Sequence, residues 1–339
     1  MKFQVGYQSD RRFIQYIVQH SEKIQELYFP WGDFTTGRGV VQGYDEQKIM
    51  EEDLKIFSEK GVKLCLLLNG NCYGRNALGR SFFRKLGDSI DLIHSTYTLS
   101  SVTTASPVIA KFICSNFPFL EVRASVNMEL GTVEAIEYLE EYFHSFYLKR
   151  EYNYDRNVLS RMRQFSRNKG KKMYLLANSG CLNYCSARTF HDNLVAHQHQ
   201  IAEMDNAFLF QGLCSLYLDD EEKRKKLLGK SNFIRPEDVS AYEELCDGMK
   251  LATRTNYNPL AVVTAYFNGK WHGNLLDLTE PAHSEKFPSA ILDNRKIPAD
   301  YLAKRLACDK KCENCSYCVS VLENAMVKLN DIISMDKGV

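Results

Sequence analysis

Short apolar runs alternate with segments of helical apolar spacing over the first 255 residues, and this alternation constrains the fold most. Segments 49–57 and 133–142 show the helical spacing, with apolar residues at every third or fourth position. The eight apolar runs are Phe3–Val5, Glu26–Phe29, Val62–Leu68, Ser101–Thr104, Leu120–Ala124, Phe143–Leu148, Lys172–Ala177 and Met249–Ala252. Strands that alternate with helices form parallel βαβ units, and eight units close a sheet. We therefore predict an α/β fold, a TIM-like (β/α)8 barrel, with an open doubly wound sheet as the alternative.

The chain departs from a plain barrel at two places. About 70 residues separate the seventh run from the eighth, far more than an ordinary βα loop contains. We therefore expect an insertion at about residues 178–248, within a barrel domain of residues 1–280. A C-terminal extension follows over residues 281–339, with a dense group of cysteines and a closing helix expected near Val319 to Met335.

Polar, turn-forming segments follow five of the predicted strands. In a barrel, such segments converge on the C-terminal face, where active sites are built. The alternative is that Asn, Gly and Ser form ordinary loops there. Five such segments at one rim favour an enzyme. They are Asn69–Arg75, Ser125–Asn127, Lys149–Glu151, Asn178–Cys181 and Thr253–Arg254.

Charge and hydropathy limit which cellular compartment and which kinds of partner we expect. The net charge of +1 gives no whole-molecule field that would favour nucleic acid or a membrane. The segment between Lys149 and Lys172 is locally basic, either as the solvated face of a helix or as the footprint of an anionic partner. The opening residues lack a signal-peptide pattern, and no apolar run reaches the roughly 18 residues of a membrane helix. We expect a cytoplasmic protein with no membrane partner.

Four of the eleven cysteines lie within eleven residues of the extension, at Cys308, Cys312, Cys315 and Cys318. Thiolates this close repel one another unless a cation neutralises them, and both zinc and iron–sulfur clusters accept four sulfurs. We therefore expect a metal site here, for an iron–sulfur cluster or for zinc. The alternative is four reduced thiols without a ligand.

A second cysteine group directly follows the seventh predicted strand. Cys181 and Cys185 lie at the strand end, and Cys214 follows within the insertion. Three thiolates at a barrel rim could hold three irons of a 4Fe-4S cubane. The fourth position is expected to be taken by Cys246, with Cys72 as the alternative.

Polar residues near this group indicate proton transfer and anion binding. His191 is a candidate proton-transfer group, at a helix start that Asp192 or Asn193 would cap, and His197 is a second candidate. Arg235 precedes a predicted helix that starts with Pro236, and Lys250 and Arg254 lie at the end of the last strand. These three cations are candidate catalytic groups that hold a carboxylate; the alternative is that they are salt-bridge partners.

Several segments of the chain resemble the family called peptidase U-32: Leu176–Cys181, Phe190–Asn193, Ile234–Asp238, Lys250–Arg254 and Gly273–Leu276. The resemblance spans about residues 60 to 280, and it implies a barrel. It also implies a 4Fe-4S cluster held by four cysteines and oxygen-independent hydroxylation of ubiquinone precursors, tRNA or ribosomal RNA. The extra cysteines of the extension depart from this pattern. Either two metal sites exist, or the extension supplies the missing thiolate to one shared site.

Three functional hypotheses follow. The leading one is an iron–sulfur redox enzyme that hydroxylates or otherwise modifies a small-molecule or RNA substrate, with an electron-transfer partner. The second is a collagenase-like peptidase. The third is a zinc-bearing module that binds RNA or protein through the basic segment after Lys149. The chain lacks the Gly-x-Ser-x-Gly, His-Glu-x-x-His and phosphate-loop motifs of other hydrolases and nucleotidases. The oligomeric state does not follow from the sequence.

Overall fold

Eight parallel strands form a closed barrel in the computed structural model, which describes residues 1–40, 43–205, 208 and 210–329. Each strand pairs with the next in the chain, and β1 closes the barrel on β8, with Phe3 beside Met249. Every predicted run overlaps a strand, so the TIM-like barrel is confirmed. The strands are β1 Phe3–Gly6, β2 Ile24–Phe29, β3 Leu64–Leu68, β4 Leu99–Thr104, β5 Glu121–Ala124, β6 Ser145–Tyr147, β7 Lys172–Leu176 and β8 Gly248–Leu251.

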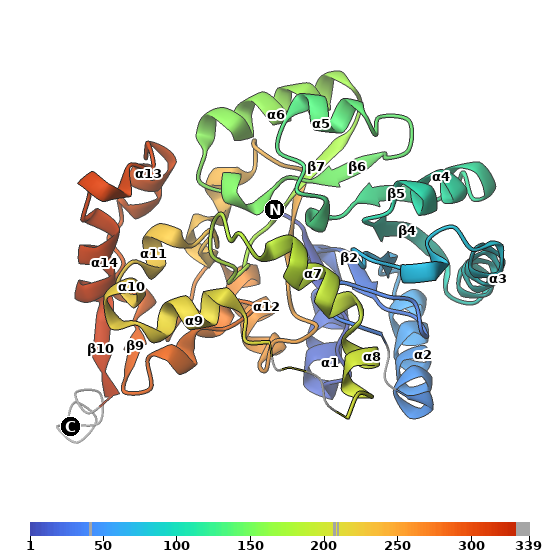
Figure 1. Ribbon diagram of the computed structural model, residues 1–339, viewed down its shortest axis with the longest axis horizontal. Coiled ribbons are helices and arrows are strands. Elements are labelled where there is room, and N and C mark those ends of the chain that lie inside the picture. Colours follow the sequence, from blue (N-terminus) through green and yellow to red (C-terminus); the bar gives the residue numbers. More distant parts are fainter. Residues whose placement is uncertain (41–42, 206–207, 209, 330–339) are drawn as a thin grey trace.

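Helices surround the barrel (Figure 1). Because side chains alternate along a strand, those facing outward pack on the helices and form the main apolar core. The helix α6 illustrates the local causes: the Asp155 side chain caps its first turn by accepting from Val158 N, and Leu159 and Met162 are buried. The surrounding helices are α1 Arg11–Gln19, α2 Tyr44–Glu59, α3 Arg80–Tyr97, α4 Pro107–Asn116, α5 Val133–Glu137, α6 Arg156–Asn168 and α12 Pro259–Asn268. Short 3-10 helices are η1 Ser21–Lys23, η2 Gly74–Asn76, η3 Val126–Met128 and η4 Arg150–Tyr152.

The barrel interior is polar at its centre. Arg123 of β5 donates to Glu26 of β2, to Glu121 at 2.6 Å and to Ser145 at 3.0 Å. Its guanidinium also lies 4.5 Å from the centre of the Tyr174 ring. This ion-pair network is buried and satisfied, so it holds strands together below the mouth of the barrel.

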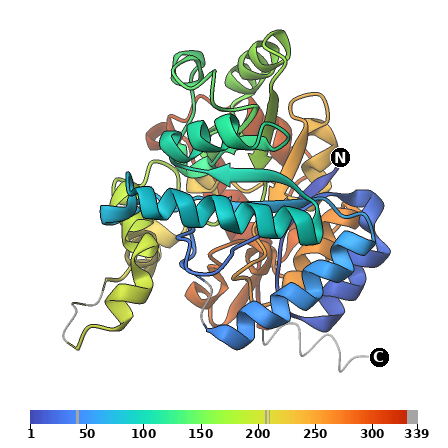
Figure 2. The ribbon, with the colours of Figure 1, turned by 90° about the vertical axis from the view of Figure 1, so that its right-hand side faces the viewer.

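A run of short helices connects β7 to β8. Figure 1 shows α7 crossing the barrel, and in Figure 2 the yellow-green α7 and α8 extend to one side of it. We predicted a helix start capped by Asp192 or Asn193; this is wrong, because α7 already begins at Arg188. The elements are α7 Arg188–Ala196, α8 Gln198–Ala202, α9 Leu213–Asp219, α10 Glu221–Arg224, α11 Leu227–Lys230 and η5 Pro236–Tyr242.

The C-terminal segment packs against this connection at the side of the barrel (Figure 1). Arg305 donates to the carbonyl oxygens of Leu228 and, at 2.8 Å, of Ser231. The closing helix predicted to Met335 ends at Ala325, where the chain turns into a strand antiparallel to β9; residues 330–335 lie outside the described part. Its elements are η6 Leu275–Leu278, η7 Ser284–Lys286, β9 Ala290–Leu292, η8 Asn294–Lys296, α13 Tyr301–Leu306, η9 Cys312–Asn314, α14 Tyr317–Ala325 and β10 Met326–Lys328.

The predicted division into domains is not tested by the structure. The division into a domain of residues 1–280 with an insertion at 178–248 and an extension of 281–339 stays a prediction. Among the described residues, none of the helices combines the length and the apolar character needed to cross a bilayer.

Candidate functional site

A pocket of about 290 Å³ opens at the C-terminal ends of the strands, and we call it the mouth pocket. Its floor consists of Tyr28 of β2, Leu67 of β3, Leu176 of β7 and Lys250 of β8. Each of the five polar segments singled out in the sequence contributes to its wall, as expected for the loops of one barrel rim. These contributions are Asn69, Val126 and Asn127, Arg150, Cys181, and Arg254.

Lys250 lies at the bottom of the mouth pocket and is only 7% exposed. Its Nζ lies 4.0 Å from the centre of the Tyr28 ring and 5.2 Å from that of Tyr147. The pKa of Lys250 is lowered to about 7, mainly by burial; the Arg254 and Arg123 charges act in the same direction, and Cys65 and Glu26 act in the opposite one. A cation–π contact thus takes the place of a counter-ion.

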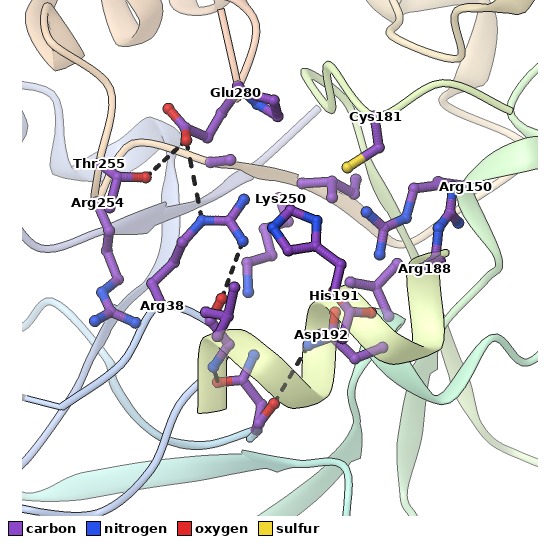
Figure 3. A pocket seen from close by; sticks show the side chains of 18 of the residues that line it. Arg38, Arg150, Cys181, Arg188, His191, Asp192, Lys250, Arg254, Thr255 and Glu280 are labelled. Carbon is purple, nitrogen blue, oxygen red and sulfur yellow. Dashed lines mark hydrogen bonds and ion pairs between the residues drawn. The ribbon is translucent and has the colours of Figure 1, made fainter. Parts of the chain in front are cut away.

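Two arginines from different loops form one side of the pocket (Figure 3). Arg254 donates to Thr36 Oγ1 at 3.0 Å, and burial lowers the pKa of its guanidinium to about 10. Arg38 Nε lies 3.9 Å from Glu280 Oε1. Among the residues that the structure describes, Arg254 has no acidic partner, so it is available to an anion.

The other side of the pocket carries Arg150 and Arg188 (Figure 3), which belong to an ion-pair cluster with Glu129 and Glu151. Arg188, the first residue of α7, lies 2.7 Å from Glu151 and 3.0 Å from Glu129. Arg150 lies 3.8 Å from Glu129. The cluster ties α7 to the loops after β5 and β6. We did not predict Arg38 or Arg188, because their role depends on contacts between distant loops.

Cys181, Cys185 and Cys214 all line the mouth pocket and are partly buried. Burial raises the pKa of the Cys214 thiol, and the nearby Cys181 and Cys185 thiols add to the rise. The three cysteines predicted to share a site therefore lie close together. Over the described ranges, however, no three His, Cys, Asp or Glu side chains are placed so that they could hold one metal ion.

The loop that carries Cys181 is fixed by Gly180. The Gly180 N–H donates to Glu280 O at 2.8 Å, and its carbonyl oxygen lies 2.7 Å from His283 Nε2. A Cβ at this position would approach Pro281 O to 1.9 Å, so only glycine fits. This close packing directs the chain from β7 over the pocket.

Cys246 is not a ligand of the mouth pocket, which corrects the prediction for the fourth cysteine. It is 3% exposed, its Sγ donates to Tyr242 O at 3.5 Å, and it borders a hollow beside Met1 and Lys2. That hollow lies at the N-terminal end of the barrel, before β1 and β8 begin. The helical pattern around Cys246 had a structural cause, namely burial beneath η5.

The alternative fourth cysteine, Cys72, lies in the loop after β3 and does not line the mouth pocket. A hydrogen bond with His197 and one from Gly74 N at 3.4 Å lower the pKa of the Cys72 thiol. The same bond to Cys72 raises the pKa of His197. His197 Nδ1 lies 2.9 Å from Gln200 Oε1. Cys72 thus forms a pair with an imidazole.

Of the two remaining catalytic candidates, His191 lines the mouth pocket and Arg235 does not. His191 lies within α7, is exposed, and lines the mouth pocket, as Figure 3 shows. Arg235 does not line it: its guanidinium is bound by both oxygens of Asp238 at 2.8 Å. Arg235 is 6% and Asp238 7% exposed, so this is a buried structural pair rather than an anion site.

The four C-terminal cysteines line a separate cavity of about 1020 Å³, which we call the tail pocket. Cys308, Cys312 and Cys315 are exposed and Cys318 is partly buried. Burial raises the pKa of Cys318; Arg305 lowers it, and the other three thiols raise it again. The tail pocket and the mouth pocket share no lining residue, which favours two sites over one shared site.

Comparison with known proteins finds a related sequence and a solved structure with the same barrel fold. No protein-family model matches the chain. Uncharacterized protease MJ1657 of Methanocaldococcus jannaschii is 25% identical over 347 residues, covering 96% of this chain and 98% of that protein. The solved U32 peptidase Mk0906 has the same barrel, with a TM-score of 0.55 and 14% identity over 74% of this chain and 92% of that one. This chain is thus similar over nearly its whole length to a protein named as a protease, and in its barrel to a U32 peptidase.

Both similarities support the resemblance to the peptidase U32 family drawn from the sequence segments. The relatives are named as a protease and a peptidase. At 14% identity, the likeness to U32 peptidase Mk0906 shows the barrel alone. The ligand roles of the cysteines in this chain stay predictions.

Proposed function

We propose that this chain is an enzyme that binds an anionic substrate at the barrel mouth and modifies it by redox chemistry with a 4Fe-4S cluster. One observation carries the proposal: three thiols and two cations without acidic partners among the described residues, Lys250 and Arg254, line the same pocket. Small molecules and RNA nucleotides both present anionic groups, so either remains a substrate class under this proposal.

The donor set of the mouth pocket suits iron more than a hard cation, because thiolates are the ligands of iron–sulfur clusters. Cys181, Cys185 and Cys214 would hold three irons, and no fourth cysteine lines the pocket. As placed, the thiols do not surround one metal, so binding would require their side chains to turn toward one another. The cluster would supply one-electron transfer.

The residues of the chain itself would bind and orient the substrate. Arg254 and Lys250 would attract an anionic group, and the rings of Tyr28 and Tyr147 would keep water from the Lys250 amine. His191, exposed on α7, would accept or donate a proton at the substrate. The three thiols line the same pocket, so the distance for electron transfer between the cluster and the substrate would be short.

Anaerobic purification with iron, sulfide and zinc analysis tests this proposal. We expect about four irons per mouth-pocket cluster, with iron lost in Cys181→Ser and in Cys214→Ser. Cys114→Ser is a matched control, because Cys114 is also partly buried but does not line the pocket. Its Sγ donates to Tyr142 O at a distance of 3.3 Å. Unchanged iron content in both pocket variants would contradict the proposal.

A peptidase is the second candidate function, favoured by the Cys72–His197 pair and by the names of the relatives. A thiol beside an imidazole is the usual arrangement of a cysteine nucleophile and its base. This function predicts that iron-free protein cleaves peptides, that Cys72→Ala abolishes cleavage, and that Cys181→Ser leaves it unchanged. Cleavage that survives in Cys72→Ala would exclude the pair.

The third hypothesis loses its main support. Three of the four arginines of α6 lie in ion pairs: Arg163 with Asp247, Arg167 with Glu244 at 3.2 Å and Arg161 with Glu134 at 3.6 Å. These pairs offset much of the positive charge of the segment, in agreement with the solvated-helix interpretation.

A further inference from the structure

Lys250 is a buried amine without an anionic partner. Its side chain is 93% removed from solvent, and within the described part of the chain its Nζ makes neither a hydrogen bond nor an ion pair. Figure 3 shows this side chain in the mouth pocket, which His191 also lines. A lysine that only stabilises the fold is normally exposed or paired with an anion. The buried, unpaired Lys250 side chain therefore indicates a role in binding or catalysis.

The groups that face Lys250 do not supply the missing negative charge. Glu26 lies below it in the barrel but is already bound by Arg123 and by Ser101 at 2.9 Å. Cys65 is fully buried, and burial raises the pKa of its thiol to about 12, which keeps it neutral. Arg254 and Arg123 are both cations. The remaining neighbours are the rings of Tyr28 and Tyr147.

We propose that Lys250 is a nucleophilic amine that forms an imine with the carbonyl group of a small oxo acid, whose carboxylate Arg254 binds. The pocket of about 290 Å³ is at the lower end of the range for small-molecule sites, which fits such a substrate. A lysine that is partly neutral at pH 7 is a competent nucleophile toward carbonyl carbon. The lowered pKa of Lys250 agrees with this role.

The step balances without an oxidant or reductant. The neutral Lys250 amine adds to the carbonyl carbon and gives a carbinolamine. The carbinolamine hydroxyl leaves as water after it takes a proton, which His191, an exposed imidazole on the pocket wall, would supply. The C–O bond is replaced by a C=N bond. The product carries its positive charge on nitrogen, where the Tyr28 ring stabilises it.

The inference rests on the anion-binding pocket of the proposed function but not on its iron–sulfur cluster. The two therefore fail separately. Protein that forms the adduct but contains no iron would keep the inference and end the proposed function. Protein that contains iron but forms no adduct would keep the proposed function and end the inference.

The test is trapping with glyoxylate and sodium cyanoborohydride at pH 7, followed by peptide mapping of the intact wild-type protein by mass spectrometry. We expect Lys250 to be the first lysine modified. Lys171 is the matched control: burial lowers its pKa too, but its Nζ donates to the carbonyl oxygens of Glu140 and Phe143 at 2.7 Å, outside the pocket. Modification of Lys171 or of surface lysines before Lys250 would overturn the inference.

Acetaldehyde in place of glyoxylate tests the requirement for a carboxylate. We expect glyoxylate to label Lys250 at least about tenfold faster, and Arg254→Gln to remove this preference, because one charged hydrogen bond is worth about that factor. Equal rates with both aldehydes would overturn the assignment of an oxo acid. Lys250→Arg keeps the charge and should form no adduct, while mapping of the wild-type chain gives the result whether or not this variant folds.

Discussion

The Lys250 amine lies 4.0 Å above the centre of the Tyr28 ring, inside a barrel where its other close charges are positive or already paired. Both residues belong to barrel strands, β8 and β2, so the contact is set by the fold rather than by a mobile loop. The fold therefore presents a buried amine with a lowered pKa to the mouth pocket.

Substitution of Tyr28 separates the two contributions of this side chain. Its hydroxyl donates to Leu251 O at 2.7 Å, so Tyr28→Phe should lower the free energy of unfolding by about 1 kcal/mol. Tyr28→Phe should leave the pH midpoint of Lys250 labelling near 7, because the ring remains. Tyr28→Leu removes the ring that favours the charged amine, so the midpoint should move to lower pH. A midpoint that rises in Tyr28→Leu would contradict the contact; labelling at graded pH measures it.

Arg235 should behave as a structural residue. Arg235→Ala leaves the Asp238 carboxylate buried without its partner, so we expect the free energy of unfolding to fall by about 3–5 kcal/mol in urea denaturation. Glyoxylate labelling of Lys250 should keep the wild-type rate in the protein that remains folded. A variant of normal stability with lost labelling would restore the catalytic role that the sequence suggested.

The buried network of Arg123 predicts how stability depends on pH. Burial raises the pKa of Glu121, but Arg123, Lys172 and Ser145 lower it to about 2, below its ordinary value of 4.5. The folded-state pKa is thus depressed, so this carboxylate stabilises the fold fully above about pH 4.5 and loses its effect as the pH falls toward 2.

Arg123→Met should weaken this pH dependence, because Lys172 and Ser145 still contact Glu121, and should destabilise the fold by about 3–5 kcal/mol, because Glu26 is left buried and unpaired. Arg161→Met is the control, since its pair with Glu134 is exposed on both sides, and it should change stability little. Urea titrations between pH 2 and 7 measure both. An acid limb of wild-type size in Arg123→Met would contradict this account.

The tail pocket should hold a metal independently of the mouth pocket. Cys312→Ser should lower zinc or iron content without changing the metal lost in Cys181→Ser, because the two cavities share no residue. Metal analysis of the single and double variants should therefore be additive. Loss of all metal in either single variant would indicate one shared site instead.

The strands could be predicted because parallel barrel strands are buried on both faces, so their apolar runs interrupt the sequence clearly. Cys181, Lys250 and Arg254 were found for the same reason: each lies at a strand end, where position along the chain fixes position on the rim. The Gly180 contact with Pro281 then sets the direction of the loop, which no local pattern reveals.

The errors have physical causes as well. A cysteine in a helical pattern is either a ligand or a core residue, and Cys246 is the latter. Arg235 and Asp238 are three residues apart at the start of a 3-10 helix, where positions i and i+3 lie on one side, so the spacing itself pointed to an ion pair. Arg188 and Arg38 were missed because only the packing of distant loops gives them a partner and a place.

The central claim is that a cluster and an anion share the mouth pocket, and electron paramagnetic resonance of the anaerobic, dithionite-reduced protein tests it most directly. The measurement uses the Cys312→Ser background, which removes any tail-pocket cluster. In this background we predict a cluster signal that is absent when Cys181→Ser is added, and that changes when oxalate, an anion that cannot form an imine, is added. The change should be lost in Arg254→Gln. In the same background, a cluster signal that survives in Cys181→Ser, or one that oxalate leaves unchanged at saturating concentration, would contradict the claim.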